Sequence, residues 1–439
     1  MWDERHALSN PPKKINIITL GCAKNQVDSE ALWSQLEGND LAITKDIGEA
    51  SIAVINTCGF IDEAKRQSID TILETVKLKH EGKLEKVIVM GCLSERYHQD
   101  LARDIPEVDR FFGTNDLPMI INELGGNYKY ELLGERALST PQYSAYIKIS
   151  EGCDNPCSFC AIPIMRGGHR TKPIEQVMDE VMRLVNKGVR ELIIIGQDTT
   201  YYGVDLYGKR MLPSLLESLA SIKELEWIRL MYAYPAKFPL DLLRVYQEHP
   251  KLCRYLDMPV QHGADSVLKS MRRGITRRAT ESLIETIRAS VPDIALRTTI
   301  ITGYPNETEE DFEELIRFIS DVKFDRLGVF TYSLEDSTTA FPLGDPIPQD
   351  VKEARRARIM DLQKEISLQR NEARIGKKVR AVVERVEDGA YIGRTAWDAP
   401  EIDNEIFLTP ALGSELQIGQ FVDVIVTDAS EYDLYGDVS

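Results

Sequence analysis

Three cysteines stand close together in the stretch Gly152-Cys153-Asp154-Asn155-Pro156-Cys157-Ser158-Phe159-Cys160, at spacings of four and three residues. Thiolates this close can all reach one metal centre. Three thiolates bind three irons of a cubane iron–sulfur cluster, whereas a full set needs four, so one iron would stay open. An open position is typical of catalytic metal sites. The spacing therefore favours a reaction centre, and the alternatives are a zinc knuckle or three unrelated thiols.

Three further cysteines, Cys22, Cys58 and Cys92, recur at intervals of roughly 35 residues, about one strand-and-helix repeat. Each follows a short apolar run that predicts a β-strand, and each has a glycine beside it. In a parallel sheet the carboxyl ends of the strands share one edge, where ligands of open α/β sheets bind. We therefore expect these thiols to converge in a second three-thiolate site. The alternative is three buried structural cysteines, since cysteine is often buried.

The elements that must position this second trio alternate between strand and helix patterns. They follow one another in residues 15–20 (strand), 28–36 (helix), 52–56 (strand), 64–78 (helix) and 87–90 (strand). Such alternation predicts a parallel sheet with helices on its faces. We assign residues 1–126 to an N-terminal domain built on an open parallel α/β sheet.

The cysteine stretch at residues 152–160 belongs to a longer run of strand and helix patterns. Six strands are expected, at residues 143–150, 191–196, 227–233, 255–259, 295–302 and 326–332. Six units fall short of the eight of a closed barrel, so residues 139–343 predict a central partial (βα)6 barrel. The stretch follows the first strand and therefore lies at the carboxyl edge, where such barrels keep their active sites.

Two other features of residues 139–343 have structural interpretations. Cys253 precedes the fourth expected strand, toward the opposite edge, and we interpret it as structural. A basic patch, which we interpret as a solvated helix face with an anion contact as the alternative, consists of Lys269, Arg272, Arg273, Arg277 and Arg278.

The end of the chain has a different pattern. Prolines and a long charged helical pattern occupy residues 344–375, which we assign as a linker and helix. Residues 376–439 carry five short strand patterns with glycine turns, which predicts a small OB-like β-barrel. Such barrels usually bind oligonucleotides. Here five Lys and Arg stand against thirteen Asp and Glu, a net charge of −8, which repels phosphates and complements a basic protein.

The composition of the whole chain sets broader limits. Its 439 residues carry a net charge of −17, with 43% hydrophobic and 28% charged residues, as in a globular protein of about three domains. No apolar run reaches the length of a membrane span, and residues 1–14 are too polar for a secretory signal. We therefore expect a cytoplasmic α/β multidomain protein whose cysteines are metal ligands or reactive thiols rather than disulfides.

Several strings of residues resemble a known family. Residues 153–160 resemble the C-x3-C-x2-C loop of radical S-adenosylmethionine (SAM) enzymes. With the upstream trio and a C-terminal TRAM-type barrel, the chain resembles the methylthiotransferases over essentially its whole length. Residues 21–30, 161–170 and 259–263 are similar to the branch that modifies a ribosomal protein. The tRNA-modifying branch typically has Gln-Met after its first cysteine and a serine where His262 stands.

The resemblance implies two 4Fe-4S clusters, each with an open iron. Cys153, Cys157 and Cys160 would hold the cluster that binds SAM and yields a 5′-deoxyadenosyl radical. The upstream trio, Cys22, Cys58 and Cys92, would hold the cluster that carries the sulfur to be donated. Two SAM molecules per turnover, one for methylation and one for the radical, would convert an aspartate of protein S-twelve of the small ribosomal subunit to β-methylthio-aspartate.

Further cofactor-binding residues are expected from their positions alone. Phe159, Gln197 and Arg297 are candidates for binding the adenosyl group, Gly303 is a further cofactor-binding candidate, and we assign no catalytic residue beyond the cluster ligands. The acidic barrel would dock basic protein S-twelve, and an electron donor and a sulfur source are required, whereas tRNA is not an expected partner. The alternatives are a tRNA adenosine methylthiotransferase and, in another class, a non-catalytic iron–sulfur or zinc-binding protein.

Overall fold

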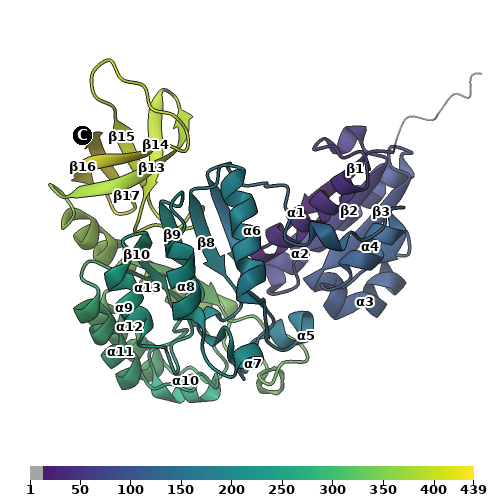
Figure 1. Ribbon diagram of the computed structural model, residues 1–439. Coiled ribbons are helices and arrows are strands. Elements are labelled where there is room, and N and C mark those ends of the chain that lie inside the picture. Colours follow the sequence, from purple (N-terminus) through teal and green to yellow (C-terminus); the bar gives the residue numbers. More distant parts are fainter. Residues whose placement is uncertain (1–12) are drawn as a thin grey trace, which may run out of the picture. The chain divides into compact units, whose positions relative to one another are not determined.

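The computed structural model describes residues 13–439 (Figure 1). The prediction that residues 1–14 are not a secretory signal therefore falls largely outside the described residues. The chain forms two compact units. The first comprises the described residues up to Ser139 together with Ile164–Arg166, and the second comprises Thr140–Pro163 and Gly167–Ser439. The finer division into residues 1–126, 139–343, 344–375 and 376–439 stays a prediction.

The first unit is built on a parallel sheet with the strand order β1-β2-β3-β4. The expected strands are β1 (Ile15–Thr19), β2 (Ile52–Thr57) and β3 (Lys86–Gly91), and a short fourth strand that the sequence analysis missed is β4 (Arg110–Phe111). The helices are α1 (Ala23–Gly38), α2 (Asp62–His80), α3 (Cys92–Asp104) and α4 (Leu117–Glu123), with short 3-10 turns η1 (Ile47–Glu49) and η2 (Tyr130–Leu132).

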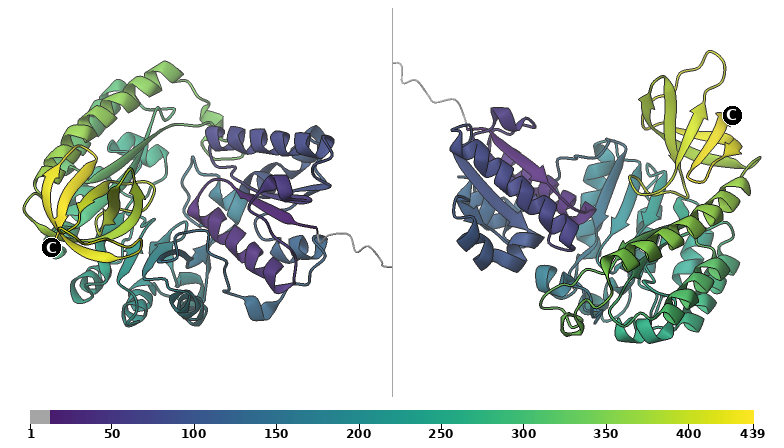
Figure 2. Two further views of the ribbon diagram at one scale, coloured as in Figure 1. Left: turned by 90° about the horizontal axis from the view of Figure 1, so that it is seen from above. Right: turned by 180° about the vertical axis from the view of Figure 1, so that it is seen from behind.

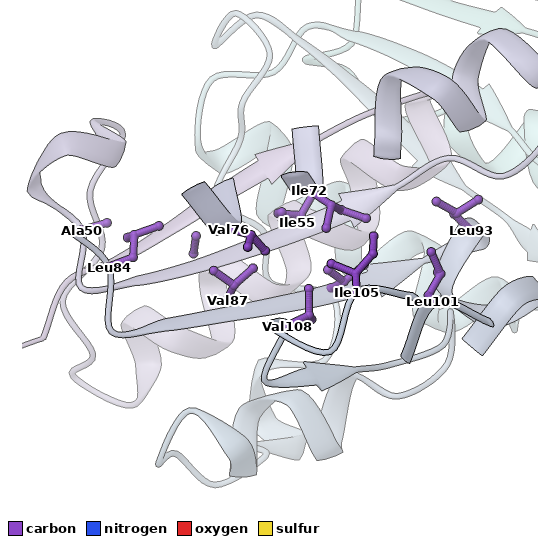
Figure 3. Packing of buried hydrophobic residues seen from close by; sticks show 12 residues of the cluster. Ala50, Ile55, Ile72, Val76, Leu84, Val87, Leu93, Leu101, Ile105 and Val108 are labelled. Carbon is purple, nitrogen blue, oxygen red and sulfur yellow. The ribbon is translucent and has the colours of Figure 1, made fainter. Parts of the chain in front are cut away.

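Helices cover both faces of this sheet. Alternate residues of each strand point to opposite faces, so each strand contributes side chains to two apolar clusters. On one face Ile55 and Val87 pack against Ile72 of α2 and Leu101 of α3 (Figure 3). On the other face Val54 belongs to a second cluster, which includes residues of α1 and α4. The middles of the strands are therefore largely apolar, and polar residues such as Asn56 and Thr57 stand at the carboxyl end of β2.

The second unit contains a parallel sheet of six strands in the order β12-β11-β10-β9-β8-β5. Its strands are β5 (Ser144–Lys148), β8 (Glu191–Ile195), β9 (Trp227–Leu230), β10 (Leu252–Asp257), β11 (Ala295–Thr302) and β12 (Arg326–Thr331). The predicted partial barrel of six strands is confirmed. Cys253 lies inside β10 rather than before it, near the amino end of the strand.

Helices connect these strands and cover one side of the curved sheet (Figure 1). They are α6 (Ile174–Asn186), α8 (Leu212–Ala220), α9 (Leu242–Glu248), α11 (Arg277–Ser290) and α12 (Glu309–Val322). Shorter elements near the strand ends are β6 (Ser150–Glu151), α5 (Ile162–Arg166), β7 (Arg170–Thr171), η3 (Thr199–Tyr201), α7 (Val204–Tyr207), α10 (Asp265–Ser270) and η4 (Phe341–Leu343).

The chain ends in a long helix and a small barrel. Helix α13 (Gln349–Glu372) packs against β12 and α12 (Figure 2). The strands that follow close into the predicted five-stranded barrel, and their order is β13-β14-β15-β17-β16. They are β13 (Lys378–Glu387), β14 (Ala390–Thr395), β15 (Glu405–Thr409), β16 (Phe421–Ala429) and β17 (Asp433–Val438).

Buried ion pairs fix this barrel to the amino ends of the six strands. Glu191, the first residue of β8, accepts hydrogen bonds from Arg229 (3.2 Å) and from Arg394 of the barrel (2.9 Å). Arg326, the first residue of β12, is paired with Asp398 of the barrel. A buried charge without its partner is very costly, so these pairs hold the barrel in place. The barrel therefore does not cover the carboxyl ends of the strands, which lie at the opposite edge of the sheet. The cysteine loop follows the carboxyl end of β5 at that edge.

Candidate functional site

The first candidate site is the loop between β6 and α5 that carries Cys153, Cys157 and Cys160. Strand β6 pairs with β7, which brings the two ends of the segment together. Gly152 has a φ of +76°, and a Cβ there would lie 2.1 Å from the carbonyl oxygen of Gly168. Only glycine fits such a position. The backbone N–H of Cys153 donates to Gly167 O at 3.1 Å, which fixes the first cysteine at the start of the loop.

Side chains from distant segments hold the middle of the loop. Arg273 Nη1 donates to Cys157 Sγ at 3.2 Å, and Tyr234 Oη lies 3.6 Å from the same sulfur. Ser158 donates to the carbonyl oxygen of Ser270 at 2.9 Å. The loop is therefore anchored to the segment around α10, and Cys157 has a defined orientation.

Burial makes these thiols poor acids in the protein alone. It raises the pKa of Cys153 to about 11 and that of Cys160 to about 12. A metal centre reverses this preference, because a coordinating thiol is deprotonated outright. Binding of a cluster would therefore release protons and replace them with positive charge.

A cavity of about 80 Å³ lies beside the loop. Its lining residues are Cys153, Asp154, Asn155, His169, Asp198 and Tyr201. Asn155 Nδ2 donates to Asp198 at 2.8 Å, which ties the loop to the segment after β8. His169 and Asp198 were not predicted as site residues from the sequence. The signals that could have found them are the position of His169 in residues 161–170, which resemble the family, and the position of Asp198 shortly after the end of β8.

His169 is held in this cavity through one of its two ring nitrogens. Its Nε2 lies 3.2 Å from Thr171 Oγ1, while its Nδ1 is buried without a hydrogen-bond partner. The Thr171 hydroxyl gives its own proton to Asp205, so His169 Nε2 must be the donor and Nδ1 the acceptor in the neutral ring. Burial lowers the pKa of His169, which favours this neutral form.

The four residues expected to bind the cofactor lie in different surroundings. Gln197 Nε2 donates to Glu151 at 2.7 Å, just before the loop, and Phe159 packs on a buried cluster that includes Met271. Gly303 has a φ of +73°. Arg297 forms ion pairs with Asp257 (3.1 Å) and with Asp403 of the C-terminal barrel (3.3 Å). The assignment of these residues to cofactor binding stays a prediction.

The second candidate site is assembled from three strand ends of the first unit. Cys22 stands immediately before α1, Cys58 follows β2, and Cys92 is the first residue of α3. A Cβ on Gly21 would lie 2.7 Å from Cys58 Cβ, and one on Gly59 would lie 3.0 Å from the backbone of Cys92. The three cysteine segments are therefore packed together. Helix N-termini favour anions, so α1 and α3 suit thiolates at Cys22 and Cys92.

Polar side chains order this second site as well. Asn25 Nδ2 donates to the carbonyl oxygens of Leu20 (2.8 Å) and Thr57 (3.0 Å), which joins two strand ends. Arg166, in the short segment 164–166 that belongs to the first unit, donates from Nε to Cys92 Sγ at 3.3 Å. Burial raises the pKa of Cys92 to about 12 and also raises the pKa of Cys58.

The donor sets of both sites fit a 4Fe-4S cluster with one open iron. Among the residues that the structure describes, no three His, Cys, Asp or Glu side chains are placed to hold a single metal ion. Thiolates that each bind a different iron of one cluster do not need to converge on a single ion. The glycines beside the cysteines leave room for backbone close to a bulky group. The six cysteines as ligands nevertheless stay a prediction.

The basic patch of the sequence analysis does not form one solvated helix face. Arg273 lies between α10 and α11, is only 4% exposed and contacts the loop, so that interpretation is wrong for this residue. Arg278 is exposed on α11, as expected. In residues 13–439, no helix is both long and apolar enough to cross a bilayer.

Comparison with known families defines the class. Residues 147–319 match the radical SAM superfamily, residues 375–438 match the TRAM domain, and residues 14–113 match the uncharacterized protein family UPF0004. The radical SAM methyltransferase TsrM of Kitasatospora setae, with cobalamin and a 4Fe-4S cluster, has a similar fold, with a TM-score of 0.57 at 13% identity over 75% of this chain and 77% of that chain. The fold and the cysteine loop thus define a radical SAM enzyme with a TRAM domain.

Full-length relatives narrow the family further. The chain is 52% identical to the ribosomal protein uS12 methylthiotransferase RimO of Flavobacterium johnsoniae over 427 residues, which are 97% of this chain and 98% of that protein. It is 50% identical to the RimO protein of Cytophaga hutchinsonii over 434 residues, 98% of this chain and 99% of that one. The chain belongs to the RimO family of radical SAM methylthiotransferases.

Proposed function

We propose that this protein transfers a methylthio group to the β-carbon of an aspartate in ribosomal protein uS12, the S-twelve protein named above. The observation that carries the proposal is the pair of three-cysteine sites, one in each compact unit of a chain of the RimO family. A simple electron carrier would use four ligands per cluster, so two sites with three thiols each favour catalysis.

The residues of this chain have separate tasks in that reaction. When bound, the clusters and two SAM molecules supply the electron, the radical chemistry and the sulfur, which side chains cannot provide. Cys153, Cys157 and Cys160 hold one cluster in a loop at the carboxyl ends of the strands. The upstream trio of Cys22, Cys58 and Cys92 holds the other cluster. The cavity beside Cys153 places the hydrogen-bonding side chains of Asn155 and Asp198 next to the loop.

The C-terminal barrel supports a protein as the substrate. Residues 376–439 have a net charge of −8, which disfavours a phosphate backbone and attracts a basic protein. We propose that the barrel docks uS12 through this charge. An electron donor and a sulfur source complete the system. We expect the enzyme to act in the cytoplasm, where free thiols stay reduced.

Two incubations test this function. The protein, reconstituted without oxygen to about eight irons per chain, is given SAM and a reductant with either uS12 or tRNA. We expect 5′-deoxyadenosine to form and uS12 alone to gain the mass of a methylthio group. The gain of that mass by tRNA would contradict the proposed substrate. About four irons per chain with no 5′-deoxyadenosine would contradict the two-cluster enzyme altogether.

A further inference from the structure

Each of the two cysteine sites has one buried arginine that donates a hydrogen bond to a cysteine sulfur. In the second unit, Arg273 donates from Nη1 to Cys157 Sγ at 3.2 Å and from Nη2 to the carbonyl oxygen of Pro259. Its guanidinium lies 4.3 Å from the centre of the Tyr234 ring, and Tyr234 Oη donates to the carbonyl oxygen of Arg273 at 2.8 Å. The guanidinium is therefore held at three points, and one of them is a cysteine sulfur.

Arg273 has a donor that nothing in the protein uses. The residue is 4% exposed, and its Nε is buried without a hydrogen-bond partner. An unsatisfied buried N–H on a charged group is costly, so such a group calls for an acceptor. A cluster held by Cys157 would bring inorganic sulfides, which accept hydrogen bonds, close to this guanidinium.

Arg166 is the counterpart in the first unit. It is 3% exposed and donates from Nε to Cys92 Sγ at 3.3 Å. Its Nη1 donates to Asp28 at 2.8 Å, and its Nη2 donates to Asn25 Oδ1. Asn25 also joins the ends of β1 and β2, so Arg166 is oriented by the same residue that orders the cysteine segments.

We propose that Arg166 and Arg273 are positioning residues that each fix one ligand thiolate and raise the reduction potential of the cluster it binds. The proposal rests on the two clusters of the proposed function. Reduction adds negative charge to a cluster, and a buried cation with N–H groups near its sulfurs stabilises that charge. The guanidinium group of arginine is a permanent cation in proteins, so the proposed effect needs no switch.

The test uses full-length chains that keep one cluster each. Replacement of Cys22, Cys58 and Cys92 by alanine leaves the loop cluster, in which Arg273→Gln and Arg273→Lys are compared with Arg278→Gln. Arg278 is exposed on α11, so its variant removes the same charge away from the site. Replacement of the three loop cysteines leaves the other cluster, in which Arg166→Gln and Arg166→Lys are compared with exposed Arg103→Gln.

The readout is the midpoint potential of the bound cluster, followed by its paramagnetic signal during a redox titration. At the parent's midpoint, each Gln variant at position 166 or 273 should have about a tenfold lower ratio of reduced to oxidised cluster, which is about 59 mV for a one-electron couple. The Lys variants, which keep the charge, should shift less in the same direction. The Arg278 and Arg103 variants should not shift.

Outcomes separate this proposal from the function on which it rests. If the one-cluster chains without an arginine substitution bind no cluster, both the proposed function and the role of the arginines are refuted. Parents with a cluster and Gln variants with normal iron but an unchanged midpoint would refute only the role of the arginines. If a Gln variant loses its cluster, the Lys variant decides: a midpoint equal to the parent's shows a merely structural arginine, and a more negative midpoint supports the proposal.

Discussion

The two cysteine sites are built in opposite ways. Cys153, Cys157 and Cys160 lie within eight residues of one loop, whereas Cys22, Cys58 and Cys92 are spread over about 70 residues. The second trio meets only because β1, β2 and β3 pair in parallel with their carboxyl ends aligned, as in the pairing of Thr57 with Gly91. One site depends on a turn and the other on a whole sheet.

This difference predicts how each site fails. A loop held by Gly152 and by the pairing of β6 with β7 should tolerate losses in the first unit. A site at three strand ends should lose its geometry whenever the sheet that aligns them opens, because its ligands share no local segment.

The largest effect is the loss of a ligand. Cys157→Ala should abolish both 5′-deoxyadenosine formation and methylthio transfer, whereas Cys58→Ala should abolish transfer and leave 5′-deoxyadenosine formation. Each abolished activity should fall by more than about 100-fold, because even an outer partner of a metal ligand is worth 10–100-fold in affinity or activity. Both products are measured in one assay. Equal loss of SAM cleavage in the two variants would contradict the division of labour.

Glu191→Gln tests the unit that carries the loop. It leaves Arg229 and Arg394 buried without their carboxylate, and breaking such a pair costs about 3–5 kcal/mol of unfolding free energy. Exposed Glu226, paired with Arg380 at 2.8 Å, is the control, and its Gln variant should cost less than about 1 kcal/mol. Denaturant unfolding measures both. Similar losses in the two variants would contradict the assigned importance of the buried pair.

The same carboxylate gives a pH dependence. Burial alone would raise the pKa of Glu191, but Arg394 and Arg229 outweigh it, and its pKa in the folded protein is lowered. A lowered pKa stabilises the fold above the unfolded value of about 4.3 and loses that stabilisation as the pH falls through the folded value. The wild-type chain should therefore lose more stability on acidification than Glu191→Gln. Parallel pH profiles of the two chains would refute this.

Ile72→Ala tests the sheet that assembles the second trio. Ile72 of α2 is fully buried against β2 and β3, so its truncation should cost about 2–5 kcal/mol (Figure 3). Leu73, next to it but 48% exposed, is the control. Iron bound by the first unit should fall in the Ile72 variant while 5′-deoxyadenosine formation persists. A parallel loss of both would show that the loop depends on this unit.

Gly21→Ala should have a smaller effect at the same site. Gly21 has a φ of +90°, and its new Cβ would meet Cys58 Cβ at 2.7 Å. Gly82, with a φ of +74° and no atom within 4 Å of a Cβ, carries the backbone strain without the contact. Strain of this kind costs about 1–3 kcal/mol. Only the Gly21 variant should also lose iron, which is measured per chain. Equal iron in the two variants would mean that Gly21 is not needed for the approach to Cys58.

The same contrast decides what the sequence could predict. The loop is visible in its spacing, and the second trio follows from strand length and the rule that parallel strand ends share an edge. The six-stranded sheet and the five-stranded barrel also follow from periodicity. Arg166 and Arg273 could not be found in this way, because their partners Cys92 and Cys157 are more than 70 residues away and no local pattern records such a contact.

The charge pattern around α10 and α11 gave a wrong prediction for Arg273, because its contacts also come from distant parts of the chain. The cluster of arginines around α10 and α11 predicted a solvated face, since charged residues are rarely buried. Arg273 is an exception because its guanidinium donates to a sulfur and to a carbonyl oxygen and lies against an aromatic ring. The short strand β4 was missed because two residues carry no periodicity.

The smallest expected effect is at Cys253, which serves as a reference for both sites. It lies in β10 and is 2% exposed, and burial raises its pKa to about 11. At pH 8 only about one thiol in a thousand would then be a thiolate, which is the reactive form. In the protein without clusters, iodoacetamide should label exposed Cys22 first and leave Cys253 unlabelled until the chain unfolds, as read by peptide mass spectrometry. Cys253→Ala should keep the wild-type iron content, because the residue belongs to neither trio, and a loss of about four irons per chain would instead make it a ligand.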